Sequence, residues 1–323
     1  MKTIYKVLLS ILAFFALSSV GGYFYFRKKF QAPANQLVVT GLPATSSFVW
    51  LADSTTKPVT AHAAILLPVR LPGCPRTCYV QFDTGAPTSL FYGKSLAALR
   101  TRYPATQAAL PVQNDTLHNL SFPLGQGRIL ARRLRVIQYG ASGVPADTTR
   151  PFIIGTLGAD VLDGRALVLD YARQQFGLHD RLPAGLAQQA AFTPLSFAER
   201  RVQFTATVEG QSRQLLFDSG SSAFALLTSK DNFEALARPA APVQVASVNS
   251  LGRTLTSYTV ATPAALQVGT AAVPLGTVTH IEGTRFTEEM LMRFSGMGGM
   301  LGNAPFVTRT LILDVRGGRL GIL

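Results

Sequence analysis

The chain has 323 residues, of which 47% are hydrophobic and 15% are charged, and its formal net charge is +13. This length predicts one large or two medium domains with packed cores, and the low share of charged residues excludes an intrinsically disordered chain. The densest basic group, Arg132, Arg133 and Arg135, has no aromatic residues between its members, so we expect a basic solvated surface in the vicinity of anionic lipid and no nucleic-acid partner.

The first 29 residues have the pattern of a targeting or anchoring segment. Two lysines precede the largely apolar residues 7–26, and three basic residues follow. This apolar run is long enough to span a bilayer as an uncleaved signal anchor. A signal peptide cleaved after Ser18 is the alternative. In either case we expect the rest of the chain to be exported. An uncleaved segment would anchor it to a membrane by residues 7–26, and a cleaved one would leave it secreted or periplasmic.

The remainder of the chain is dominated by short strand-like runs. Residues 30–45 have the composition of a linker, and the runs that follow are broken by Gly, Pro, Asn and Asp. This pattern predicts a mainly β protein. Helical periodicity is confined to a few short segments: 94–103, a stretch near 184–191, 230–238 and 286–294.

The only two cysteines, Cys74 and Cys78, bracket a Pro-Arg-Thr turn between two strand-like runs. A zinc site needs more ligands, no histidine lies nearby in sequence, and the spacing is not the CxxC of redox enzymes. A small disulfide across this hairpin is therefore predicted, consistent with an oxidising compartment. Two free thiols are the alternative.

The second half of the chain repeats the order of elements in the first half. Three pairs of blocks correspond: 63–91 with 201–227, 123–137 with 267–281, and 155–178 with 299–322. An ordered repeat of whole units predicts two similar lobes. We assign residues 46–185 to the N-terminal lobe and residues 186–323 to the C-terminal lobe.

Each lobe contains an Asp-Thr/Ser-Gly triplet after an apolar run that ends in Phe. The two stretches are VQFDTGA at 80–86 and LLFDSGS at 215–221. Only about 0.15 such triplets are expected by chance in a chain of this composition. If the two loops meet, Asp83 and Asp218 cannot both ionise cheaply, so the pair would hold one proton. One carboxyl group would then act as base toward a bound water and the other as acid toward a carbonyl oxygen.

The other residues of the triplets suit the support of such a pair. Thr84 and Ser219 supply hydroxyls that can bond locally or across to the other lobe. Gly85 and Gly220 let the backbone turn sharply and bring N–H groups close to the carboxylates. The four histidines are isolated in sequence, so we expect no metal site.

Over most of residues 46–323 the sequence resembles aspartic peptidases of the pepsin and retropepsin superfamily, in their bilobal single-chain form. The resemblance rests on four stretches: FDTGA at 82–86, FDSGS at 217–221, IIGTLG at 153–158 and MLG at 300–302. It implies two β-barrel-like lobes with an active-site cleft between them. It further implies a catalytic dyad of Asp83 and Asp218, interlocking hydroxyls of Thr84 and Ser219, no cofactor, and an extended peptide bound as an added strand.

The resemblance is uneven at the hairpin that covers the cleft in pepsin-like enzymes. The corresponding stretch, roughly 108–122, lacks the tyrosine found there in the family, and Tyr139 falls in a later strand and is not assigned that role. We expect an exported or membrane-anchored, monomeric aspartic endopeptidase. A peptide-binding module of the same fold with little or no turnover is the alternative. A glycosidase is disfavoured because Trp50 is the single tryptophan.

Overall fold

The computed structural model describes residues 31–54, 59–250, 253–283 and 297–323. The chain divides into two compact units, Met1–Ala34 and Asn35–Leu323, and the second unit contains the fold described below. The predicted anchor and the predicted helix at 286–294 lie outside the described residues. No helix within the described part of the chain has the length and apolar character needed to cross a bilayer.

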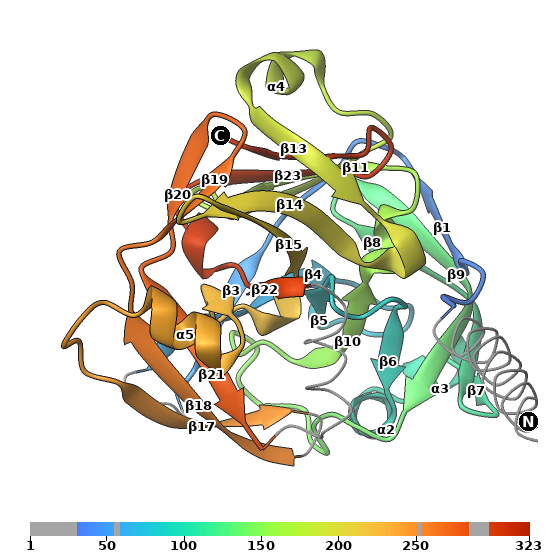
Figure 1. Cartoon of the computed structure of the whole chain (residues 1–323). Coiled ribbons are helices and arrows are strands. Elements are labelled where there is room, and N and C mark those ends of the chain that lie inside the picture. The colour runs from blue at the N-terminus through green and yellow to red at the C-terminus, as the bar shows by residue number, and fades with distance from the viewer. Residues whose placement is uncertain (1–30, 55–58, 251–252, 284–296) are drawn as a thin grey trace, which may run out of the picture. The chain divides into compact units, whose positions relative to one another are not determined.

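The fold is mainly β, as predicted, and its strands form two sheets (Figure 1). Within the described residues neither sheet closes into a barrel, so the barrel-like form expected of the lobes is not seen. Three predicted helices are present: α2 (Gly93–Arg102), α4 (Ala184–Gln189) and α5 (Lys230–Leu236). The short helix α3 (Ala105–Ala109) follows α2.

The first sheet has nine strands and belongs to the first half of the chain, residues 35–185. Its order is β3 (Val49–Asp53), β4 (Thr60–Val69), β5 (Cys78–Asp83), β10 (Ile153–Gly158), β6 (Leu90–Tyr92), β9 (Gly127–Ile137), β8 (Thr116–Leu124) and β7 (Val112–Gln113), with β1 (Leu37–Thr40) paired to β9.

The second sheet has fifteen strands, most of them from the second half, residues 186–323. Its order is β17 (Gln244–Ser250), β18 (Arg253–Ala261), β21 (Thr277–Glu282), β16 (Leu226–Leu227), β22 (Met297–Leu301), β15 (Gln211–Phe217), β14 (Val202–Val208), β13 (Ala191–Ser196), β24 (Arg319–Ile322), β23 (Thr310–Asp314), β11 (Ala166–Asp170), β12 (Gln175–His179) and β2 (Ala44–Ser47). Strand β19 (Ala265–Val268) pairs with β14, and β20 (Ala271–Pro274) pairs with β19.

The segment predicted to be a linker, 30–45, contains strand β1 and the start of β2. The β-branched run Leu37–Thr40 pairs with β9, and β2 pairs with β12. The linker prediction was therefore wrong for these residues, because their pairing partners lie far away in the sequence.

The sequence repeat corresponds to a repeated arrangement of strands. In the first half, β10 runs parallel to β5 and antiparallel to β6. In the second half, β22 runs parallel to β15 and antiparallel to β16. The glycines matched in sequence also share a left-handed backbone, since φ is 55° at both Gly125 and Gly269. Each of these glycines lies close to a neighbouring strand. A Cβ at Gly125 would collide with Thr45 of β2, and a Cβ at Gly269 would lie 2.7 Å from the Phe192 oxygen of β13.

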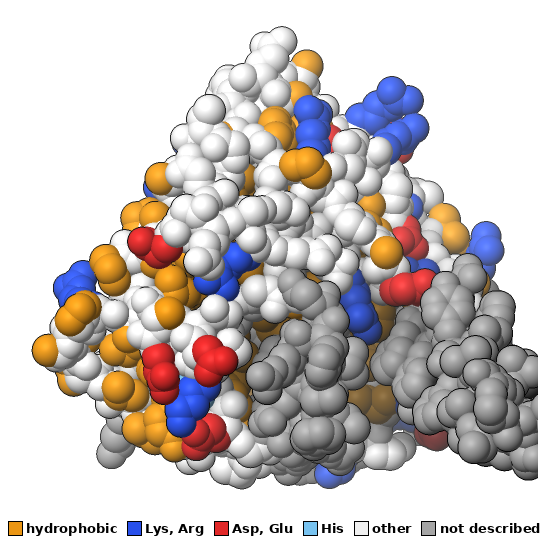
Figure 2. All heavy atoms as spheres, in the orientation of Figure 1, with side chains coloured by type: hydrophobic (Ala, Val, Ile, Leu, Met, Phe, Trp, Pro, Cys, Tyr) orange, Lys and Arg blue, Asp and Glu red, His pale blue; other side chains and the backbone are white. Residues whose placement is uncertain are grey.

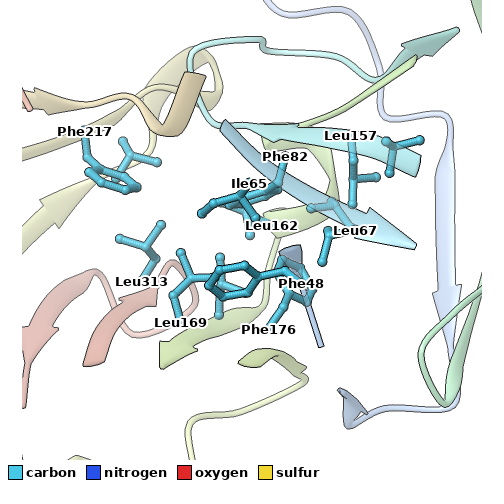
Figure 3. Packing of buried hydrophobic residues seen from close by; sticks show 14 of the residues in the cluster. Phe48, Ile65, Leu67, Phe82, Leu157, Leu162, Leu169, Phe176, Phe217 and Leu313 are labelled. Atoms are coloured by element: carbon cyan, nitrogen blue, oxygen red, sulfur yellow. The ribbon is translucent and has the colours of Figure 1, made fainter. Parts of the chain in front are cut away.

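The two halves are joined by one sheet and one hydrophobic core. Strands β11 and β23 pair antiparallel from Ala166↔Asp314 to Asp170↔Thr310, and Figure 1 shows β11, β13 and β23 in one layer. Figure 3 shows side chains from both halves packed together, with Phe82 and Leu169 of the first half near Phe217 and Leu313 of the second. The two halves therefore cannot separate without exposing a shared core.

Candidate functional site

Two equivalent strands place the two predicted aspartates. Strand β5 ends at Asp83, and Asp218 follows directly after the last residue of β15. The phenylalanines before them, Phe82 and Phe217, are fully buried and hold the strand ends in the core. Behind the second loop, the Asp218 N–H donates to the Leu301 oxygen of β22 at 2.8 Å. Each aspartate is thus fixed at the end of a buried strand.

The loops that follow the two strands lie against each other. The Gly85 N–H donates to Asp83 Oδ1 at 2.8 Å, and the Gly220 N–H donates to Asp218 Oδ1 at 2.8 Å. A Cβ at Gly85 would lie 2.5 Å from Asp218 Oδ1, and a Cβ at Gly220 would collide with the Asp83 carboxylate. The structure therefore brings together the two aspartates and both glycines named from the sequence, with each glycine lying against the carboxylate of the opposite loop.

The hydroxyls of Thr84 and Ser219 cross between the halves, and we call their four hydrogen bonds the hydroxyl lock. The Thr84 N–H donates to Ser219 Oγ at 2.9 Å, and the Ser219 N–H donates to Thr84 Oγ1 at 2.9 Å. Each hydroxyl then donates to the opposite strand end, Thr84 Oγ1 to the Phe217 oxygen at 3.0 Å and Ser219 Oγ to the Phe82 oxygen at 3.1 Å. Both side chains are buried, so each loop completes the hydrogen bonding of the other.

Burial and a neighbouring charge raise the pKa of Asp83 to about 7. Desolvation is the largest cause, and the charge of Asp218 is the next. The N–H groups of Gly85 and Ala86 act in the opposite direction, because they stabilise the ionised form. Asp83 therefore carries a proton through the acidic range, beside a second carboxyl group in the same site.

The two loops differ at the third residue after the aspartate. Ser221 Oγ donates to Asp218 Oδ2 at 2.9 Å. The first loop has Ala86 at this position, which offers Asp83 only its N–H, at 3.2 Å. The site is therefore asymmetric, since a side-chain hydroxyl serves the carboxylate of Asp218 and only backbone N–H groups serve that of Asp83.

Each loop also bonds a residue of the other half, Arg200 just before β14 or His62 in β4. Arg200, which is buried, donates from Nη1 to the Pro87 oxygen at 3.2 Å and from Nε to Asp163 Oδ2 at 3.0 Å. In the other direction, Ser222 Oγ donates to the His62 oxygen at 2.6 Å. Pro87 and Ser222 each lie four residues after an aspartate, so the two contacts are related by the internal repeat. Neither contact could be predicted from the sequence, because the partners are distant along the chain.

Asn303 supports the second loop from behind. This fully buried amide donates from Nδ2 to the Ser219 oxygen at 3.1 Å and to Ser222 Oγ at 2.9 Å. Its Oδ1 accepts a hydrogen bond of 2.6 Å from the hydroxyl of Tyr171, which belongs to the first half. Every polar atom of the amide side chain is thus used to fix the loop of Asp218 relative to the shared sheet.

Asp160 supports the segment that follows the first loop. Its carboxylate is buried and accepts from the Ser89 hydroxyl at 2.7 Å and from the Ser89 N–H at 2.8 Å. The same hydroxyl accepts from the Gly158 N–H at 2.9 Å. Burial raises the pKa of Asp160, and the hydrogen bonds from Ser89 oppose that rise.

An aromatic pair lies next to the first aspartate. Tyr92 is buried, its hydroxyl is 2.7 Å from Thr156 Oγ1, and its pKa is raised first by burial and also by the charge of Asp83. Tyr139 contacts the Tyr92 ring edge-on at 4.9 Å between centroids and is 59% exposed. Neither tyrosine was assigned to the site from the sequence. Tyr92 could have been suspected, since it closes the strand that follows the Asp83 loop.

The expected covering hairpin at roughly 108–122 is short in the structure. It is formed by β7 and β8, which pair only at Val112↔Leu117 and Gln113↔Thr116. The hairpin at the matching place in the second half, β17–β18, pairs from Gln244↔Thr259 to Ser250↔Arg253. The longer of the two hairpins is therefore in the second half.

The predicted disulfide is not formed. Cys74 and Cys78 are free thiols with their sulfur atoms 3.9 Å apart. The turn between them is held by other bonds, since the Cys74 N–H donates to the Leu71 oxygen at 3.1 Å and Cys74 Sγ donates to the Arg76 oxygen at 3.4 Å. The buried Arg76 guanidinium in turn bonds three backbone oxygens of the loop at 145–150.

Two carboxyl groups that share a site and differ in protonation can activate a water molecule between them. The hydroxyls of Thr84, Ser219 and Ser221 all donate to backbone or carboxylate oxygens, so their place in the site is one of support. Within the described residues no group of three or more His, Cys, Asp or Glu side chains could hold a metal ion. No protein-family model and no curated protein matches the chain.

Proposed function

We propose that this protein is an exported or membrane-anchored aspartic endopeptidase, in which Asp83 and Asp218 activate a water that hydrolyses a peptide bond. One observation carries the proposal: two equivalent Asp-Thr/Ser-Gly loops lie against each other, each glycine facing the opposite carboxylate. The hydroxyl lock supports it, because it fixes the relative position of the two loops with four reciprocal hydrogen bonds.

The two carboxyl groups take different roles in the proposed reaction. Asp218, which accepts a hydrogen bond from the Ser221 hydroxyl, removes a proton from the bound water. The water oxygen then forms a bond to the peptide carbonyl carbon. Asp83 gives its proton to the carbonyl oxygen, so the intermediate carries two hydroxyls on one carbon. The carbon–nitrogen bond then breaks as the nitrogen takes the proton from Asp218, and one hydroxyl returns its proton to Asp83.

The strand arrangement supports a bilobal acid-protease fold of the pepsin and retropepsin type as the finer description of this protein. Strands β10 and β22 each insert between the strand before an aspartate loop and the strand after it, in the same orientation. Strands of both halves join in the shared sheet. In this proposal an extended peptide would bind as an added strand between the lobes.

A second candidate is a peptide-binding module of the same fold with little or no turnover. The observation that favours it is the short β7–β8 hairpin, which pairs at two positions and lies in a stretch without tyrosine. A covering hairpin excludes water from a reacting site and holds the substrate in place. A shorter hairpin would therefore lower the rate of turnover more than the affinity for the peptide.

Proteolysis of a denatured protein mixture between about pH 3 and pH 7 tests the proposal. Cleavage by the wild-type chain is expected, and Asp83→Asn and Asp218→Asn should each abolish it. Asp180→Asn is the matched control, since its carboxylate is exposed and its ion pairs within the described residues are with the exposed Arg181 and Arg316. Cleavage that survives in either dyad variant would refute the mechanism. Binding of a statine-type inhibitor by a wild-type chain that cleaves nothing would favour the binding module.

A further inference from the structure

The face of the first sheet that carries Asp83 can be followed from strand to strand. In β5 the buried Phe82 separates Gln81 from Asp83, so both of these half-buried residues point to the face opposite the core. In the parallel ladder of β5 and β10, Asp83 lies opposite Gly158 and Gln81 lies opposite Thr156. Thr156 therefore shares the face of Asp83 and lies about 7 Å further along β10.

Tyr92 continues this face on the next strand. Thr156 lies opposite Leu90 in the antiparallel ladder of β10 and β6, and Tyr92 is two residues after Leu90. The Tyr92 hydroxyl is 2.7 Å from Thr156 Oγ1, so the two side chains lie on the same face. Tyr139 packs edge-on against Tyr92 at 4.9 Å between ring centroids. A row of side chains thus leads from Asp83 through Thr156 and Tyr92 to Tyr139.

Tyr139 is the only exposed aromatic side chain among the described residues, with 59% of its surface accessible. Singly exposed apolar side chains are ordinary, and they are scattered among polar ones on the face drawn in Figure 2. Tyr139 differs from these because its ring ends a row of side chains that begins at Asp83. Such a ring offers a large apolar contact surface to a ligand and loses little conformational freedom on binding.

The turn that carries Tyr139 is fixed against helix α2. The Tyr139 oxygen accepts from the Lys94 N–H at 3.1 Å, and the Ala141 N–H donates to Ser95 Oγ at 3.1 Å. Gly140 between them has a φ of 97°, and a Cβ at this position would collide with Ser95 Oγ. The ring is therefore presented by a backbone that is already ordered, which lowers the entropic cost of binding a ligand.

We propose that Tyr139, backed by Tyr92, determines the specificity of a subsite that binds an aromatic or large aliphatic side chain of the peptide substrate. This inference rests on the proposed function, which places an extended peptide across the two aspartates. In an extended peptide, a residue two to four positions from the scissile bond lies roughly 7–13 Å from it. The row from Asp83 to Tyr139 covers a comparable distance, with about 7 Å to Thr156 and the two rings beyond.

Digestion of a denatured protein mixture by the full-length chain, with the cleavage sites identified by mass spectrometry, tests the proposal. The wild type should show enrichment of Phe, Tyr, Trp or Leu at one position within about four residues of the cleaved bond. Tyr139→Ala should lower kcat/KM roughly three- to tenfold for a peptide with Phe at that position, and leave the same peptide with Ser there unchanged. Tyr139→Phe keeps the ring and should retain the preference.

Val59→Ala is the matched control, since it removes a 57% exposed apolar side chain outside the row from Asp83 to Tyr139. Its cleavage profile should equal that of the wild type. A preference that survives in Tyr139→Ala would overturn the proposal, and so would a wild-type profile without enrichment at any position. Enrichment of Asp or Glu instead would also overturn it, because recognition would then belong to Arg135, which lies opposite Leu90.

The subsite is also measured without turnover, which separates it from the proposed function. Octapeptides of Gly and Ser with one Phe at successive positions are titrated into Asp218→Asn that carries isotope-labelled tyrosine. The ring signals of Tyr139, assigned with Tyr139→Phe, should shift with a Phe peptide and stay unchanged with a Phe-free peptide. These shifts in a protein whose wild type cleaves nothing would refute the proposed function and support the subsite. Unchanged Tyr139 signals at saturating peptide would overturn the subsite, whether or not the wild type cleaves.

Discussion

Gly85 lies directly against the carboxylate of Asp218, and a Cβ at this glycine would be 2.5 Å from Asp218 Oδ1. The two residues come from different halves of the chain, so the carboxylate of one loop occupies the space that a side chain of the other loop would need. The same relationship holds in reverse between Gly220 and Asp83. The absence of a side chain at these glycines is therefore what allows the two carboxyl groups to approach each other.

We expect Gly85→Ala to abolish peptidase activity, because the new methyl group forces the two loops apart. The same collision should lower the free energy of unfolding by roughly 1–3 kcal/mol. Thermal unfolding and a cleavage assay measure the two effects. Gly143→Ala is the control, since nothing lies within 4 Å of the Cβ it introduces. Full activity of the Gly85→Ala variant would show that the loops need not meet for function.

The hydroxyl lock predicts a strong coupling between Thr84 and Ser219. Either Thr84→Val or Ser219→Ala removes one hydroxyl and leaves the N–H of the other residue without its acceptor, which costs about 1–3 kcal/mol of folding free energy. The double variant should cost less than the sum, because the first substitution loosens the contact between the two loops and so weakens the bonds that the second substitution removes. Denaturant unfolding of the four proteins in the cycle measures this coupling.

Thr101→Val is the control for that cycle. Its hydroxyl donates to the Ala97 oxygen on the exposed face of α2, so its loss should change stability by no more than about 0.5 kcal/mol. Strict additivity of Thr84→Val and Ser219→Ala would contradict the interdependence of the two loops.

The raised pKa of Asp83 predicts a specific pH dependence. Because the pKa is about 7 in the folded chain and 3.8 in the reference state, the folded protein binds this proton more tightly than the unfolded one. The associated stabilisation is complete below about pH 4 and is lost as the pH rises toward 7. Peptidase activity should likewise fall as the pH rises through about 7, because the acid that protonates the carbonyl oxygen is then ionised.

Unfolding free energies of the wild type and of Asp83→Asn, measured from about pH 4 to pH 8, check this expectation. As the pH rises, the unfolding free energy of the wild type should fall relative to that of the Asp83→Asn variant. A difference that is constant over this range would mean that Asp83 is not the group with the raised pKa.

The sequence predicted those parts of the site that depend on local pattern. The two Asp-Thr/Ser-Gly triplets follow apolar strands that end in Phe, and the repeat of surrounding blocks indicated that the triplets occupy equivalent places. The structure brings Asp83 and Asp218 together as that repeat suggested. Helices α2 and α5 were also predictable, because their apolar periodicity is contained within the helix itself.

The parts that escaped prediction depend on partners far away in the sequence. Asn303 looks like an ordinary polar residue after a strand, and only the fold places its amide between Ser219 and Tyr171. Strand β1 is only four residues long within a segment that resembles a linker, and its pairing with β9 decides its structure. The spacing of Cys74 and Cys78 permitted a disulfide but could not reveal that Arg76 and backbone bonds already hold that turn.

The buried Arg200 gives the last prediction, since it connects the second half of the chain to the loop of Asp83. Its guanidinium bonds the Pro87 oxygen and forms an ion pair with Asp163 at 3.0 Å, and its backbone adopts a φ of 58°, which is unfavourable for a residue other than glycine. Arg200→Met keeps much of the side-chain volume but removes both interactions. We expect a loss of roughly 1–3 kcal/mol in stability, because Asp163 is then left partly buried without its cation. We also expect a larger loss of kcat than of substrate affinity, because Pro87 lies in the loop that positions Asp83.

Arg173→Met is the control, since its pair with Asp170 is formed by an arginine whose side chain is 83% exposed. Steady-state kinetics of the two variants decide the point. An Arg200→Met enzyme with unchanged kcat would show that the loop of Asp83 holds its position without this contact.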